Sequence, residues 1–188
     1  GGSQLAMGSA ADIRDISTIY INTNLAAAAG VVAALIATQV MYKKVDLTMA
    51  LNGALGGLVA VTAEPLAPSP AIAIFVGAVG GLLVVLTVPL LDKLKIDDVV
   101  GAIPVHLIAG IWGTIAVIFS NGDASIATQI IGIIAIGAFV VVTTGIVWTV
   151  LKMSIGIRVT EEEEVAGLDQ KEIGMEAYPE FGRGSQTM

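Results

Sequence analysis

Five long apolar runs, separated by short polar connections, constrain this chain more than any other feature of its sequence. The runs cover residues 18–42, 47–63, 70–91, 99–119 and 126–152. Each is close to the roughly 20 residues that a helix needs to cross the hydrocarbon core of a bilayer. An open sheet would leave unpaired backbone groups in lipid. The sequence therefore predicts an all-α, polytopic membrane bundle of five transmembrane helices.

The scarcity of charge supports a membrane protein over a soluble one. Charged residues make up only 13% of the chain, against about a quarter in an ordinary soluble domain. A soluble protein with five buried helices would need far more polar surface. The 22 glycines favour close helix contacts. The pairs Gly53/Gly57 and Gly77/Gly81 each lie on one helix face, which predicts tight crossings.

The basic residues predict the orientation of the chain. Six of them follow the first, third and fifth runs, and the opposite loops hold only Arg14. By the positive-inside rule, residues 1–17 lie outside the cell and residues 153–188 form a cytoplasmic tail of a multi-pass protein of the plasma or inner membrane. The six are Lys43, Lys44, Lys93, Lys95, Lys152 and Arg158.

Several classes of function find no support in the sequence. The chain has no cysteine and one histidine, so we expect no metal site, and no cofactor motif is present. No Ser-His-Asp set has a credible placement, so we do not expect an enzyme. The nine Lys and Arg residues form no patch that would bind nucleic acid.

His106 is the most informative polar residue within the runs. It is the single histidine and lies about one third of the way along residues 99–119. An ionisable side chain at that depth usually faces the bundle interior or a cavity, and imidazole exchanges protons near neutral pH. Two readings stay open: a pore or proton-relay residue, and a neutral histidine hydrogen-bonded to a neighbouring helix. Asp97 and Asp98 precede this run, where carboxylates favour a helix N-terminus.

Other polar or aromatic side chains within the runs are candidates for pore lining or for helix packing. Side chains of this kind most often form bonds across helices. The candidates are Asn22, Asn52, Thr62, Trp112 and Thr114.

Residues 97–114 resemble the most distinctive segment of the Amt/MEP/Rh ammonium transporters, specifically of the Amt branch. Further stretches fit the same family in order, and the resemblance covers residues 1 to about 180. They are residues 1–3, 21–25, 52–59, 61–63, 156–159, 161–164, 167–169 and 174–178. Ile173 stands where some relatives carry a histidine.

The resemblance implies an eleven-helix channel or transporter for nitrogen uptake, built from two inverted five-helix repeats plus a last helix. It implies a homotrimer with a pore in each subunit. Such repeats are a general transporter plan. On that plan, residues 1–17 hold the end of helix six and an outer loop, and residues 18–152 are the last five helices. Because the chain opens Gly1-Gly2-Ser3 without Met, we expect a fragment or half-protein.

The resemblance also assigns roles to single residues. His106 corresponds to the second histidine of the family's pore pair, and Ser3 to the hydroxyl that helps receive ammonium outside. The first histidine, the gate phenylalanines and the recruitment tryptophan belong to positions before residue 1. Ammonium would be deprotonated and ammonia conducted through an apolar pore. The alternative is an ammonium sensor or transducer with the same fold.

The tail carries two open readings. The run Glu161–Glu164 is typical of a solvated or disordered segment. The resemblance instead implies a regulatory segment that packs beneath neighbouring subunits and adjoins the docking surface of a PII signalling protein. The residues implied are Arg158, Gly167, Leu168, Asp169 and Tyr178.

Overall fold

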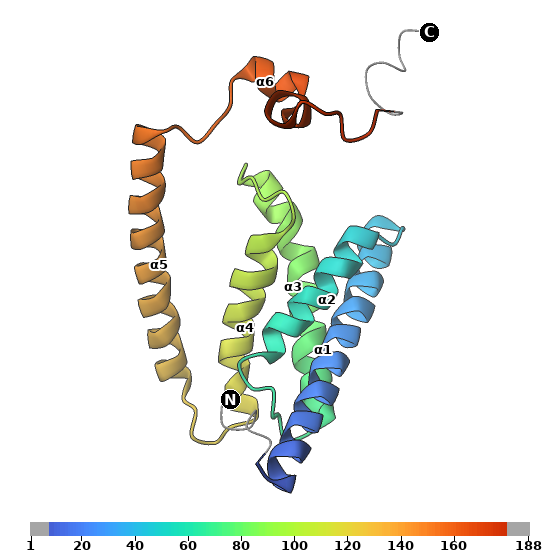
Figure 1. Ribbon diagram of the computed structural model, residues 1–188. Coiled ribbons are helices and arrows are strands. Elements are labelled where there is room, and N and C mark those ends of the chain that lie inside the picture. Colours follow the sequence, from blue (N-terminus) through green and yellow to red (C-terminus); the bar gives the residue numbers. More distant parts are fainter. Residues whose placement is uncertain (1–7, 180–188) are drawn as a thin grey trace. The chain divides into compact units, whose positions relative to one another are not determined.

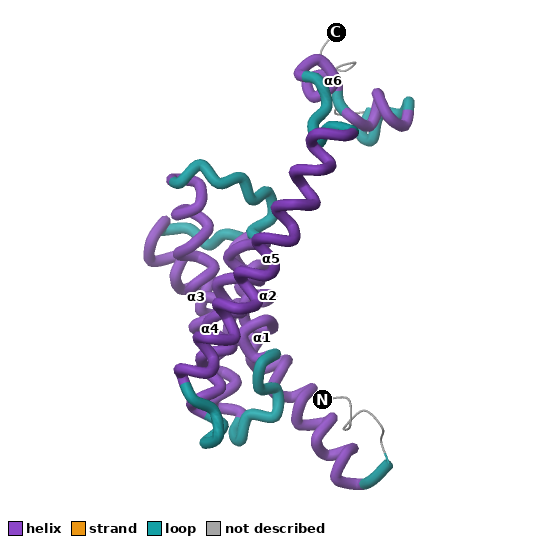
Figure 2. Tube along the Cα trace, turned by 90° about the vertical axis from the view of Figure 1, so that its left-hand side faces the viewer, coloured by secondary structure: helices purple, strands orange, loops and turns teal. Residues whose placement is uncertain are grey.

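The computed structural model describes residues 8–179, and every regular element in that range is a helix (Figure 2). This confirms the predicted all-α class. The chain divides into two compact units, Gly1–Ile136 and Gly137–Met188, each of which is described by itself. The elements are α1 (Ala10–Tyr42), α2 (Leu47–Val61), α3 (Pro70–Lys93), η2 (Ile103–Ile108), α4 (Ala109–Ala116), η3 (Val117–Phe119), α5 (Ile126–Ser154), α6 (Glu161–Ala166) and η4 (Asp169–Ile173).

Polar side chains at the connections start the first three helices. Ser9 Oγ accepts a hydrogen bond from Asp12 N at 3.2 Å, and Asp46 Oδ1 accepts one from Met49 N at 2.8 Å. Ser69 caps α3 in the same way. These bonds satisfy backbone donors that have no partner within a helix. Because Ser9 is a cap, α1 begins well before the apolar run at residue 18.

Three helices are long and apolar enough to cross a membrane: α1 with 33 residues, α3 with 24 and α5 with 29. The other two apolar runs form shorter helices. With 15 residues, α2 extends about 22 Å, less than the roughly 30 Å of a hydrocarbon core. The segment Ile103–Phe119 is also short. The protein is therefore a membrane helix bundle whose apolar helices differ in length.

The helices α1, α2 and α3 lie side by side (Figure 1) and touch through glycine. A Cβ atom added to Gly57 of α2 or to Gly77 of α3 would collide with the carbonyl oxygen of Ala26 in α1, and one added to Gly81 would collide with that of Gly30. Backbones that approach this closely gain dispersion contacts that large side chains would prevent. The tight crossings predicted from the glycine spacing are confirmed.

The core of the first unit is made of small side chains. Ala26, Ala34, Ala73, Val84 and Val85 are fully buried. Larger apolar side chains lie on the outside of the bundle, as Leu47 does with 75% of its surface exposed. This distribution suits lipid, which is as apolar as the side chains themselves.

Candidate functional site

His106 lies in a segment where the helix departs from α geometry. Val105 N donates to Gly101 O, four residues back, at 3.1 Å, whereas Ala109 N donates to Pro104 O, five residues back. The six-residue segment Ile103–Ile108 is therefore a π-type turn. Pro104 stands in the first turn of this segment, where a backbone N–H has no partner within the helix.

The His106 side chain faces outward from the described bundle. It is exposed, whereas Pro104 and Val105 are buried. Within residues 8–179 no hydrogen bond reaches its imidazole, so bonding to a neighbouring helix is not observed there. The arrangement leaves both ring nitrogens able to meet a solute or another part of the protein.

Asp98 caps the start of this segment. Its Oδ1 accepts from Ala102 N and its Oδ2 from Ile103 N, each at 2.8 Å. A carboxylate that accepts two backbone donors at a helix start is well placed against the positive end of the helix dipole. The expectation of a carboxylate at this N-terminus is met by Asp98.

Asn52 reaches the same turn from α2. Its side chain is only 9% exposed, and Nδ2 donates to Val100 O at 2.9 Å. Gly101 follows with a φ of +80°, and a Cβ at that position would lie 2.7 Å from Asn52 Nδ2. Glycine tolerates that backbone conformation and leaves room for the amide. Asn52 and His106 are thus connected through a short stretch of backbone.

Trp112 and Thr114 have partners within the first unit. Trp112 Nε1 donates to Val76 O in α3 at 2.9 Å. Its ring centroid lies 6.0 Å from that of Phe75 and 6.2 Å from that of Phe119. Thr114 Oγ1 donates to Gly110 O at 2.9 Å. The Trp112 contacts with Val76 and Phe75 fix α4 against α3, which is a packing role, whereas the Thr114 bond stays within α4.

Asn22 and Thr62 lie at the loop that joins α2 and α3. Asn22 is 1% exposed, and its Nδ2 donates to Pro65 O at 3.0 Å and to Ala67 O at 3.3 Å. Its Oδ1 is buried without a hydrogen-bond partner in the described chain. Thr62 Oγ1 donates to Val59 O at 2.6 Å. Neither side chain contacts the His106 turn, and Ser3 lies outside the described residues.

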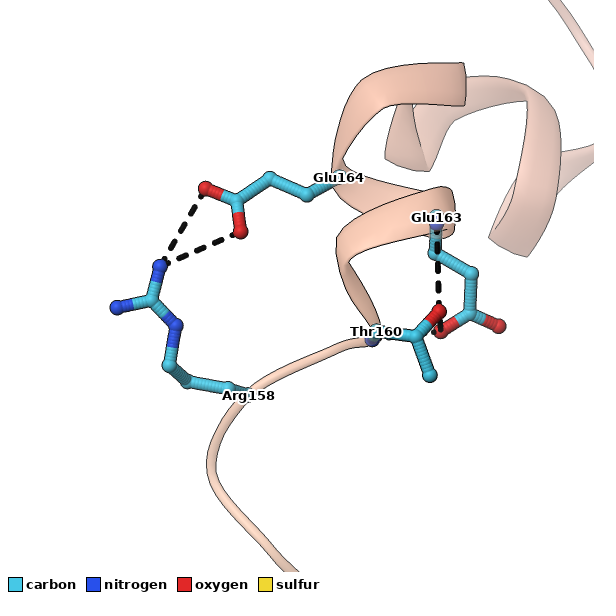
Figure 3. Close-up of polar contacts among 4 residues, drawn as sticks. All are labelled: Arg158, Thr160, Glu163 and Glu164. Carbon is cyan, nitrogen blue, oxygen red and sulfur yellow. Dashed lines mark hydrogen bonds and ion pairs between the residues drawn. The ribbon is translucent and has the colours of Figure 1, made fainter.

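The acidic run of the tail forms the helix α6. Glu163 N donates to Thr160 Oγ1 at 3.3 Å, and Thr160 N donates to Glu163 Oε2 at 3.0 Å (Figure 3). This is a capping box. The Thr160 backbone N–H, helped by its hydroxyl and then by Lys171, lowers the pKa of Glu163. The tail from Thr160 is therefore ordered locally, which departs from the reading of a disordered acidic run.

Ion pairs surround this cap. Arg158 Nη2 lies 3.3 Å from both carboxylate oxygens of Glu164 (Figure 3). Lys171 Nζ lies 3.5 Å from Glu163 Oε1. The Arg158–Glu164 pair is largely exposed, so solvent screens its attraction.

The remaining tail candidates divide into structural and exposed residues. Asp169 Oδ2 accepts from Ala177 N and Oδ1 from Gln170 N, each at 2.9 Å, and these two backbone donors lower the pKa of Asp169. Gly167 has a φ of +102°, and a Cβ there would lie 2.7 Å from Asp169 Oδ1. Leu168 and Tyr178 have exposed side chains.

Sequence reasoning overlooked Pro104. Its signal was present in the sequence, since proline is common in the first turn of a helix, where its missing N–H has no partner in any case. That Val100 O accepts from Asn52, 48 residues away, was not visible. Among residues 8–179 no group of three or more His, Cys, Asp or Glu side chains is placed to hold a metal ion.

Known proteins similar to this chain are described as ammonium transporters. A family model described as Ammonium Transporter Family matches residues 1–178. The ammonium transporter Amt2 of Archaeoglobus fulgidus is 39% identical over 88% of this chain and 40% of its own length. An ammonium transporter of Bacillus subtilis is 34% identical over 85% of this chain and 43% of its own length.

A solved structure titled Sensor Amt Protein superposes with a TM-score of 0.79 and 30% identity, covering 84% of this chain and 42% of that one. The chain therefore spans about two fifths of the length of the relatives it matches. The resemblance expected from residues 97–114 is confirmed by these comparisons. The chain belongs to the Ammonium Transporter Family.

Proposed function

We propose that this chain is the second part of a transporter that carries ammonium across a membrane. The observation that carries the proposal is His106, an exposed imidazole without a hydrogen-bond partner in the described chain, set in an apolar helix. The relatives named above are ammonium transporters, which supports the same solute. The rest of the protein would complete the wall that His106 faces.

The proposed mechanism separates the proton from the nitrogen. Moving an ammonium ion into an apolar pore costs several kcal/mol, whereas a neutral molecule of similar size costs much less. Ammonium held at the outer mouth by groups such as the Ser3 hydroxyl would lose its proton there. Ammonia would then pass along the apolar helices, where the His106 imidazole offers it a hydrogen bond or accepts a proton. Potassium would be excluded because it has no proton to give up.

The proposed setting is a homotrimer in the plasma or inner membrane, with five spans of this chain over residues 18–152. Support for its orientation comes from the six basic residues on one side. The tail over residues 153–188 would lie in the cytoplasm and meet neighbouring subunits or a PII protein. A pull-down of PII by the full-length protein with and without residues 156–178 tests whether the tail contributes to PII binding. Equal binding by the two proteins would show that it does not.

The test of conduction is His106→Ala in the full-length protein, reconstituted in liposomes. We expect ammonium-evoked current, ammonia flux or potassium exclusion to change. Thr114→Val is the matched control, because the Thr114 hydroxyl bonds only its own helix within the described chain. If all three properties were unchanged in His106→Ala, the assignment of His106 would fail.

A second candidate function is ammonium sensing with the same fold. It is favoured by one observation, the likeness to the structure titled Sensor Amt Protein. The two functions differ in whether ammonium or ammonia crosses the membrane. A folded full-length protein that binds ammonium, measured by calorimetry, but passes neither current nor ammonia would be a sensor.

A further inference from the structure

A small cavity lies between α2, α3 and α4, at the helix ends that are outside the cell in the proposed orientation. It offers about 10 Å³ to the centre of a water-sized sphere, which is room for one molecule of that size. Small or aliphatic side chains form most of its wall, and among its lining residues only Glu64 and Ser120 carry polar side chains. This outer cavity is separate from the His106 turn, since none of residues 101–108 lines it.

Glu64 brings an unpaired carboxylate to the outer cavity. The residue is half-buried, and within residues 8–179 no hydrogen bond or ion pair reaches its carboxylate. Its backbone is held in a turn, because Glu64 N donates to Val61 O and Glu64 O accepts from Ala67 N, each at 3.2 Å. A partly buried charge without a partner is unfavourable, so this position favours a bound cation.

Ser120 adds a second acceptor to the outer cavity. Its Oγ donates its proton to Val117 O at 3.1 Å, so the lone pairs of the hydroxyl stay free to accept. An ionised carboxylate also accepts and does not donate. The two polar side chains therefore suit a ligand that only donates. Ammonium is such a ligand, since it carries N–H donors and a positive charge, has no acceptor and is close to water in size.

The charges around the outer cavity also favour a cation. Helix α2 ends at Val61, and η3, which continues α4, ends at Phe119; the C-terminus of a helix carries partial negative charge. The N-terminus of α3 lies at the same end of the bundle, but Ser69 Oγ accepts from Ile72 N there at 3.4 Å. The connections at this end hold more acids than bases. They are Asp12, Asp15, Glu64 and Asp123 against Arg14.

We propose that Glu64 and Ser120 form an outer holding site for ammonium, in which the carboxylate and the hydroxyl accept hydrogen bonds from the ion before it loses its proton. The inference rests on the proposed function and adds a site to the Ser3 hydroxyl. The site raises the concentration of ammonium at the outer end and takes no part in conduction. Because it selects by charge and size alone, potassium should occupy it too.

The first experiment measures ammonium transport by the full-length protein in liposomes at constant ionic strength. In Glu64→Gln we expect the half-saturating ammonium concentration to rise about tenfold, and in Ser120→Ala about threefold. The maximal rate should stay unchanged in both. Asp123→Asn is the matched control, since Asp123 is an exposed carboxylate at the same end that does not line the cavity. Equal rises in Glu64→Gln and Asp123→Asn would overturn the proposal, because they would show attraction by surface charge in general.

Competition by potassium provides a second readout. When potassium chloride replaces choline chloride at the same ionic strength, the half-saturating ammonium concentration of the wild type should rise, because potassium fits the outer cavity and choline is too large for it. Glu64→Gln should weaken this competition, whereas Asp123→Asn should leave it unchanged. Absence of competition in the wild type, or undiminished competition in Glu64→Gln, would overturn the proposal.

Ala67→Val tests the cavity without changing any charge. Ala67 lines the cavity and is 4% exposed, so the added methyl groups take the space of the ion while Glu64 keeps its carboxylate. We expect the half-saturating ammonium concentration to rise and the potassium competition to weaken, as in Glu64→Gln. Thermal unfolding of the purified variant checks that it is folded, and Ser120→Ala serves the same purpose if it is not. Wild-type kinetics in a folded Ala67→Val would overturn the proposal.

A binding measurement separates this inference from the proposed function. The unfolding temperature of the full-length protein should rise more in ammonium chloride than in choline chloride at equal ionic strength, since a ligand that binds the folded state stabilises it. Glu64→Gln should reduce that difference. If the protein passes neither current nor ammonia but keeps this Glu64-dependent stabilisation, the proposed function fails and the holding site stands. If transport depends on His106 while neither transport nor stabilisation depends on Glu64, the holding site fails and the proposed function stands.

Discussion

The bundle of α1, α2 and α3 and the tail from Thr160 to Ala177 are held together by different kinds of contact. In the bundle, glycines bring backbones together, as Gly57 and Gly77 do against Ala26. In the tail, carboxylates accept backbone donors, as Glu163 does from Thr160 and Asp169 from Ala177. The first kind of contact depends on shape and the second on charge. The bundle should therefore respond to volume changes and the tail to pH and salt.

The largest expected effect is a volume change at a helix crossing. Gly57→Leu places a side chain where the backbone of Ala26 lies, and we expect a loss of more than about 3 kcal/mol in stability. Thermal unfolding of the purified full-length protein measures it. The control is Gly132→Ala in α5, where a Cβ meets nothing within 4 Å. Similar unfolding temperatures for Gly57→Leu and wild type would contradict the importance of this crossing.

A smaller effect is expected at the cap that begins the His106 segment. Asp98→Ala removes the acceptor of two backbone donors, which should destabilise the bundle by about 1 kcal/mol. Asp98→Asn keeps one acceptor oxygen and should recover part of the loss. The unfolding midpoint in denaturant reports both variants. An unchanged unfolding midpoint in Asp98→Ala would show that the stability of the bundle does not depend on this cap.

Acid should loosen the tail and leave the bundle intact. The pKa of Glu163 lies below its ordinary value of 4.5 and that of Asp169 below 3.8. A depressed carboxyl pKa gives stability that is present above the ordinary value and lost as the pH falls through the folded value. Hydrogen exchange of residues 160–177, corrected for intrinsic rates, should rise below about pH 4.5. Glu163→Gln should remove that group's part of the change.

Salt should have the smallest effect. The Arg158–Glu164 pair is exposed at both ends, by 76% and 57% of the side-chain surface, and exposed pairs contribute little. At 1 M salt the Debye length is about 3 Å, so the pair should weaken while the glycine crossings do not. Exchange of the α6 amides at low and high salt measures it. A bundle that unfolded in salt before the tail did would reverse the comparison.

Much of the fold could be predicted because local sequence determines it. Length and hydropathy alone predict the apolar helices, and the spacing of Gly53 and Gly57 predicts a close crossing. The start of α1 at Ala10 could not be placed by hydropathy, because a capped helix continues past the apolar run. The Thr160–Glu163 capping box has a readable sequence pattern, but the run of four glutamates dominated its interpretation.

The candidate site was harder to predict than the fold. His106 was singled out by its chemistry and Asp98 by its position before an apolar run. The link between Asn52 and Val100 could not be predicted, since it joins residues 48 positions apart and depends on which helices become neighbours. The Val100 carbonyl lies just before the helix that carries His106, and its partner comes from α2.

The wide turn at Ile103–Ile108 has a consequence for how the chain tolerates changes in length. A π-type turn holds about one residue more than an α-helical path between the same two ends requires. We expect deletion of a single residue there to be absorbed by conversion to a regular helix, with α4 left in place. The same deletion within α3 would rotate everything beyond it by about 100° and move its glycines off the crossing. When this turn is compared with α3, we therefore expect insertions and deletions among relatives to gather at the turn.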